Sequence, residues 1–155
     1  MTGTKRKELP LGWRWVLLSD YAEKIGSGIT PRGGQSIYVD RGVPLIRSQN
    51  VHMNRFEPRG LAFITEEQDL EMAGSRVQPG DILLNITGAS IGRVCTVPDH
   101  FCPANVNQHV SIIRPTSKIN SLFLILLCYF NSNTLTIPSR SACNNARYPF
   151  AFAHA

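Results

Sequence analysis

The chain has 155 residues, the length of one ordinary domain. Hydrophobic residues make up 43% and charged residues 17%, a balance that is typical of a globular protein and excludes wholesale disorder. The net charge is +5, and its surplus lies in the first and last thirds of the chain. These thirds can form a basic face for a polyanionic partner, or the charge can be scattered and solvated. No run reaches the roughly 20 apolar residues of a membrane helix, so we expect no membrane contact.

The sequence contains no motif that supports catalysis or metal binding. Its cysteines form no C-x-x-C pair and lie near no histidine at ligand spacing: Cys95, Cys102, Cys128 and Cys143. Reduced thiols predict a cytoplasmic protein. The glycines of 28–34 are not followed by a phosphate-loop lysine. The stretch 88–92 reads G-x-S-x-G, but it connects two predicted strands, which disfavours a hydrolase that uses Ser90. We therefore expect no enzyme, no metal and no cofactor.

The first third of the chain predicts strands separated by turns. In chain order we expect a strand over 15–18, a short helix capped by Ser19 and ended by Gly26 or Gly28, a polar loop over 27–36 and a strand over 43–47. Pro44 stands at the start of the last strand, where its missing donor is tolerated.

The remaining segments add two helices and three strands. Thr65 and Gln68 form a capping box for a helix that ends at Gly74. We then expect strands over 82–86, 93–97 and 110–114, with a tight connection over 88–92, and an apolar helix through Phe130 that Asn120 or Ser121 caps. Because short strands outnumber helices and the helices lie between them, the pattern favours an α+β fold with a curved, mainly antiparallel sheet.

Four polar loops beside the predicted strands carry the candidate contacts. Asn and Gln can read adenine, Arg can read guanine, and hydroxyl groups can bind phosphate. The alternative is that the amides only satisfy backbone groups of turns. The candidate DNA-binding residues are Thr30, Arg32, Gln35, Tyr38, Arg47, Gln49, Asn50, Asn85, Thr87, Ser90, Arg93, Asn107, Gln108 and His109.

A series of short motifs resembles a known family in its order and spacing. The motifs are LPLGW at 9–13, LSD at 18–20, GITP at 28–31, Tyr38, GVPLIRSQNV at 42–51, GDILLNITGASIGR at 80–93, NQHV at 107–110 and IRP at 113–115. Over about 9–130 the chain resembles the first target-recognition domain of the specificity (S) subunit of type I restriction-modification enzymes. The motif at 80–93 is the most specific of the series.

The resemblance implies a non-catalytic DNA-binding module. Its fold would be similar to the small DNA-binding domain of adenine-N6 methyltransferases, and it would read one half of a bipartite target in double-stranded DNA. Its protein partners would be modification (M) subunits, which methylate adenine, and restriction (R) subunits, which cut DNA.

The resemblance also predicts the organisation of the chain. We expect a basic N-terminal tail over 1–8, a target-recognition domain over 9–135 and an atypical tail over 136–155. The spacer helix of the family is missing from this tail, which suggests a truncated or frameshifted sequence. The alternative function is therefore a non-functional remnant, or a fragment that mainly binds the modification subunit.

Overall fold

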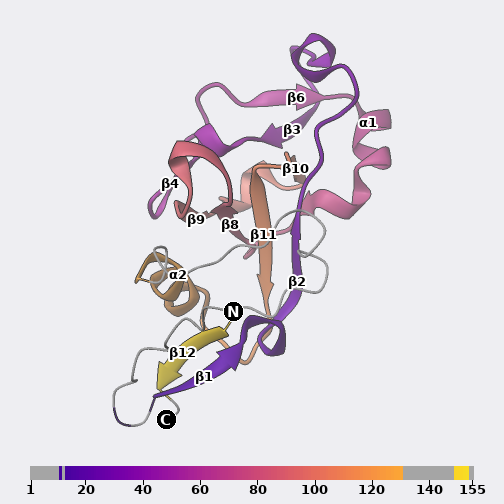
Figure 1. Ribbon diagram of the computed structural model, residues 1–155. Helices are drawn as coiled ribbons and strands as arrows, with labels where there is room; N and C mark the ends of the chain where they lie inside the picture. The colour runs from indigo at the N-terminus through magenta and orange to yellow at the C-terminus, as the bar shows by residue number, and fades with distance from the viewer. Residues whose placement is uncertain (1–10, 12, 131–148, 154–155) are drawn as a thin grey trace, which may run out of the picture.

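The computed structural model describes residues 11, 13–130 and 149–153. Two four-stranded sheets form its centre, with strand orders β6-β3-β10-β7 and β2-β11-β8-β9, and two-stranded ribbons pair β1 with β12 and β4 with β5 (Figure 1). The strands are β1 Trp13–Leu17, β2 Ala22–Ser27, β3 Val43–Ile46, β4 Val51–His52, β5 Arg55–Phe56, β6 Ala62–Ile64, β7 Arg76–Val77, β8 Ile82–Asn85, β9 Val94–Thr96, β10 Ala104–Val106, β11 Val110–Pro115 and β12 Pro149–Ala153. The helices are α1 Glu66–Glu71 and α2 Ser121–Phe130.

Strand β8 is the centre of the core because both of its faces are buried. Side chains of a strand alternate between faces. Ile82 and Leu84 accordingly pack with Leu124 of α2, whereas Leu83 packs with Val106 of the other sheet. The uninterrupted apolar run in the sequence thus reflects a strand covered on two sides.

Pairing is antiparallel throughout the described strands except between β3 and β10, which run parallel. The prediction of an α+β fold with mainly antiparallel strands and a few short helices is confirmed. The parallel pair was not predicted, and it brings the ends of β3 and β10 to the same edge.

The predicted helix after Ser19 is wrong. Only Leu18–Asp20 form a single 3-10 turn, and the following residues form β2, which pairs with β11 in the register Ile25 to Ile113. Ile25 also packs against the core around Leu124. The local capping signal at Ser19 is therefore outweighed by distant strand pairing and burial.

Both remaining helices begin as the sequence predicts. Thr65 Oγ1 accepts from the Gln68 backbone N–H at 3.2 Å, and Gln68 Oε1 accepts from the Thr65 N–H at 2.9 Å, which completes the capping box of α1. Asn120 Oδ1 accepts from the Leu122 N–H at 2.8 Å, so Asn120 rather than Ser121 caps α2. Neither helix is long and apolar enough to cross a membrane, and the same holds for every helix in the described ranges.

The ends of the chain are only partly described. The expected tail over 1–8 and the boundary between 135 and 136 lie outside the described residues, as does Cys143. Pro149–Ala153 form β12, which pairs antiparallel with β1 at one end of the molecule (Figure 1). Among the described residues, Cys95, Cys102 and Cys128 are free thiols. Burial raises the pKa of Cys95 and that of Cys128 to about 12.

Candidate nucleic-acid interface

Three polar loops form a concave surface, and the hollow that they line has a volume of about 580 Å³. One loop follows β3, one joins β8 to β9, and one precedes β11. The residues that line the surface are Ser48, Gln49, Thr87, Gly88, Ala89, Ser90, Arg93 and His109. Five of the residues predicted from the sequence therefore share one site: Gln49, Thr87, Ser90, Arg93 and His109.

The strand topology explains why these loops converge. Because β8 and β11 are antiparallel neighbours, the end of β8 lies beside the start of β11, and the Ile86 N–H donates to His109 O at 3.0 Å. Because β3 and β10 are parallel, their ends lie together, and the Asn107 N–H donates to Ile46 O at 3.0 Å. The loop between β10 and β11 thus joins the two sheets at the site.

A chain of side-chain hydrogen bonds links the loops at one edge of this surface. Thr30 Oγ1 donates to Gln108 Oε1. Gln108 Nε2 lies 2.9 Å from His109 Nε2, and His109 Nδ1 lies 2.5 Å from Thr87 Oγ1. With Gln108 donating, the imidazole carries its proton on Nδ1 and donates to Thr87. The exposed Thr87 hydroxyl can then donate outward to a ligand.

Three of the predicted contact residues are buried instead. Asn50 and Asn85 are 0% exposed and Asn107 is 7% exposed. Asn107 Oδ1 accepts from the His109 N–H at 3.1 Å, and Asn50 Nδ2 donates to Glu57 O at 2.9 Å. Their burial and hydrogen bonds favour the alternative interpretation, in which these amides satisfy backbone groups and hold the loops.

Asn85 connects two walls of the surface. Its Nδ2 donates to Ser48 O at 2.9 Å, to Val51 O at 3.3 Å and to Ser90 Oγ at 3.1 Å. The two carbonyl acceptors fix the orientation of the amide, because only the NH₂ group can donate to them. The side chain thereby holds the loop after β3 against the loop after β8.

Arg47 contacts Gly60 and the ring of Tyr38. Arg47 Nη2 donates to Gly60 O at 2.6 Å, and Gln49 Nε2 donates to the same carbonyl at 3.1 Å. The Arg47 guanidinium lies 5.6 Å from the centroid of the Tyr38 ring, a cation–π arrangement. These contacts fasten the segment 57–60 to the wall of the site.

Two arginines that were not among the candidate residues extend the positive charge. Arg55 Nη1 lies 3.0 Å from Glu57 Oε2, and Arg59 Nε lies 3.0 Å from Glu57 Oε1. Their side chains are 60% and 87% exposed. Two guanidinium groups, those of Arg55 and Arg59, thus share the Glu57 carboxylate. The sequence signal was the spacing of Arg55 and Arg59 within the basic first third.

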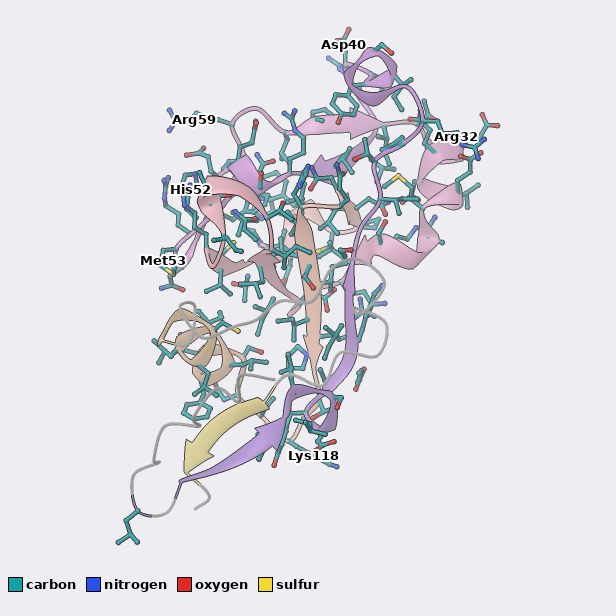
Figure 2. All side chains as sticks on the ribbon, in the orientation of Figure 1. Arg32, Asp40, His52, Met53, Arg59 and Lys118 are labelled. Carbon is teal, nitrogen blue, oxygen red and sulfur yellow. The ribbon has the colours of Figure 1, made fainter. Side chains whose placement is uncertain are left out.

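The remaining candidates stand apart from the concave surface. Arg32 is exposed and lies on the α1 side of the molecule, opposite Arg59 and His52 (Figure 2). The side chain of Gln35 lies outside what the structure describes. The interface formed by the loops is therefore smaller than the full set of candidates.

We expect the pKa of Glu57 to lie below its usual value because arginine stabilises the charged carboxylate. Hydrogen bonds from Arg59 lower the pKa of Glu57 from 4.5 to about 2. We expect Arg59→Ala to raise that pKa toward its usual value, measured by carbon NMR of the carboxyl group, while Arg32→Ala leaves it unchanged. Because the pKa is depressed in the folded chain, the stabilisation is present above pH 4.5 and disappears as the pH falls through about 2. A midpoint near 4.5 in the parent chain would contradict the ion pair.

Solved specificity subunits share this fold. The HsdS subunit from Thermoanaerobacter tengcongensis matches with a TM-score of 0.66 and 19% identity, over 94% of this chain and 35% of that chain. A structure concerned with complex assembly and conformational transition of the type I R-M system matches with a TM-score of 0.64 and 20% identity, over 94% and 36%. The type I S subunit from M. genitalium gives 0.52 and 11%, over 92% and 35%.

No family model matches the chain, and no curated protein matches it in sequence. The structural matches have identities of 11–20%, so they establish likeness of fold. Each one spans nearly all of this chain but about a third of the longer chain. The resemblance that the sequence motifs predict is thus confirmed in three dimensions: the chain has the fold of one portion of an HsdS specificity subunit.

Proposed function

We propose that this chain is a non-catalytic, sequence-specific binding module for double-stranded DNA. The observation that carries this proposal is the convergence of three polar loops on one concave surface bordered by arginines, in a fold shared with specificity subunits. In finer terms, the module reads one half of a bipartite target for a type I restriction-modification complex, in the cytoplasm where its DNA lies.

This surface would make two kinds of contact with DNA, one to phosphates and one to base edges. Exposed guanidinium groups, such as those of Arg93 and Arg59, suit phosphate oxygens and set the position of the module. Gln49 offers a donor and an acceptor, and Thr87 and Ser90 offer hydroxyls, which suit base edges in a groove. The buried amides hold these groups in place before DNA arrives, which lowers the ordering cost of binding.

The proposed protein partners are the modification and restriction subunits. These subunits would carry out methylation and cleavage, and this chain would recognise the DNA sequence. On α2, Leu122 and Leu126 are 57% and 45% exposed, an apolar surface that contact with a modification subunit could cover. A pull-down with that subunit, beside a DNA titration, separates a DNA reader from a fragment that mainly binds its partner.

We expect binding of a random-sequence duplex to weaken as salt rises, because phosphate contacts release counterions. Arg93→Ala should weaken binding at every sequence and reduce the salt slope by about 1. Fluorescence anisotropy across a salt series measures both effects. Lys118→Ala is the matched control, since Lys118 is exposed at the opposite end of the molecule from Arg59 and His52 (Figure 2). Absence of duplex binding by the folded parent chain would overturn the proposal.

A further inference from the structure

We propose that the β4–β5 hairpin is a second DNA-contacting element, which enters a groove of the duplex and presses Met53 against the base pairs. This inference rests on the proposed function. It adds the tip of a hairpin to the concave surface formed by the three loops, and the residues at this tip were not among the sequence candidates.

The hairpin presents its tip outward. Val51 pairs with Phe56 and His52 pairs with Arg55, so Met53 and Asn54 form a two-residue connection. Asn54 has φ +51, a left-handed conformation that asparagine tolerates better than most residues. The Met53 side chain is 39% exposed, and it lies at the outer edge of the molecule beside His52 (Figure 2).

The base of the hairpin is held firmly by the core. Val51 is 0% exposed, and the Phe56 ring packs against Phe101 with centroids 5.1 Å apart. The Asn54 N–H donates to Val94 O at 2.8 Å, which fixes the tip to β9. An apolar side chain on a fixed tip loses little conformational freedom when it binds, which favours its use as a contact.

The tip of the hairpin lies beside the concave surface formed by the three loops. The hairpin starts directly after the wall formed by Ser48 and Gln49, and its tip is bonded to the residue that follows Arg93. Arg55 lies on the hairpin itself, and Arg59 follows it. A duplex bound at the concave surface would therefore contact the hairpin as well.

The surroundings of Met53 favour DNA over a protein partner. The exposed Arg55 lies on the same hairpin as Met53. Arg59 and Arg93 lie nearby in the chain or in space, so the apolar tip is flanked by groups that suit phosphate oxygens. A two-stranded ribbon fits a DNA groove, and architectural proteins insert apolar side chains, methionine among them, between base steps. The Arg55 guanidinium would contact a phosphate beside that groove.

Affinity and salt dependence together test the wedge. With a random-sequence duplex and the full chain, we expect Met53→Ala to weaken binding about tenfold. The salt slope should stay unchanged, because no phosphate contact is lost. Met53→Leu should retain binding. Leu70→Ala is the matched control, since Leu70 is 67% exposed on α1, far from the hairpin (Figure 1).

A second measurement follows the tip directly. In Met53→Cys, a maleimide should label the new thiol quickly, and the duplex should slow that labelling at least fivefold, while Leu70→Cys keeps its rate. The buried Cys95 and Cys128 thiols stay protonated and react slowly. Labelling of the parent chain with and without the duplex measures the background from Cys102 and Cys143, and it is subtracted from both variants.

The outcomes separate the hairpin from the proposed function. Undiminished binding by Met53→Ala, or unchanged labelling of Met53→Cys in a chain that still binds the duplex, overturns the hairpin proposal alone. Failure of the parent chain to bind the duplex overturns the proposed function and the hairpin with it.

Discussion

Gly28→Ala should destabilise the chain by about 3 kcal/mol, because the new Cβ has no space. It would lie 1.6 Å from Val106 O and 2.9 Å from Asn107 O. Both are backbone atoms at the junction between the two sheets, and the Gly28 N–H itself donates to Val110 O at 3.3 Å. Strand β10 is paired on both sides, so this backbone cannot move aside.

Gly26, which lies in β2 two residues before Gly28, supplies the matched control. A Cβ at Gly26 would meet nothing within 4 Å, so we expect Gly26→Ala to change stability by less than about 1 kcal/mol. Urea unfolding followed by circular dichroism measures both variants. Equal stability changes at the two positions would show that the close approach of Gly28 to the backbone of β10 is wrong.

A weaker DNA affinity should accompany the Gly28 change. Gly28 lies two residues before Thr30, which donates to Gln108 in the hydrogen-bond chain at the interface. Displacing Gly28 from the backbone of Val106 would therefore separate Thr30 from that hydrogen-bond chain. Gly26→Ala should leave DNA affinity unchanged, which isolates the effect of the junction.

Segments whose pattern reflects their own burial were predictable from the sequence. The apolar run at β8 and the capping box of Thr65 and Gln68 each act within a few residues, and both appear in the structure. The helix expected after Ser19 failed because the pairing of β2 with β11 spans more than 80 residues. No local pattern carries that information.

The site was predictable in composition but not in the role of each residue. Loops that follow strands were correctly identified as polar and arginine-bearing, and the strand order brings three of them together. Whether an amide faces solvent depends on distant partners. Asn85 is buried because Ser48, 37 residues earlier, supplies its acceptor. The ion pair between Asp81 and Arg114 could not be predicted for the same reason, because the two residues are 33 positions apart in the sequence.

Asn85→Ala should cost about 3 kcal/mol of folding stability, since it removes donors from inside the protein. Ser48 O and Val51 O would each lose a hydrogen bond from the buried amide, and an unsatisfied buried acceptor costs about 1–3 kcal/mol. Asn85→Asp should cost more, because it places a carboxylate at a position that is 0% exposed against two carbonyl oxygens.

The same variant separates positioning from direct contact at the interface. Arg93 and Arg59 remain in Asn85→Ala, so the salt slope for a random-sequence duplex should persist. The walls carrying Gln49 and Ser90 lose their connection, so the preference for a duplex selected from a random pool should fall about tenfold. Ser90→Ala, which removes one acceptor and leaves both carbonyl bonds, should keep most of the stability. An Asn85→Ala chain that retains both its stability and its sequence preference would show that the two walls are held by other contacts.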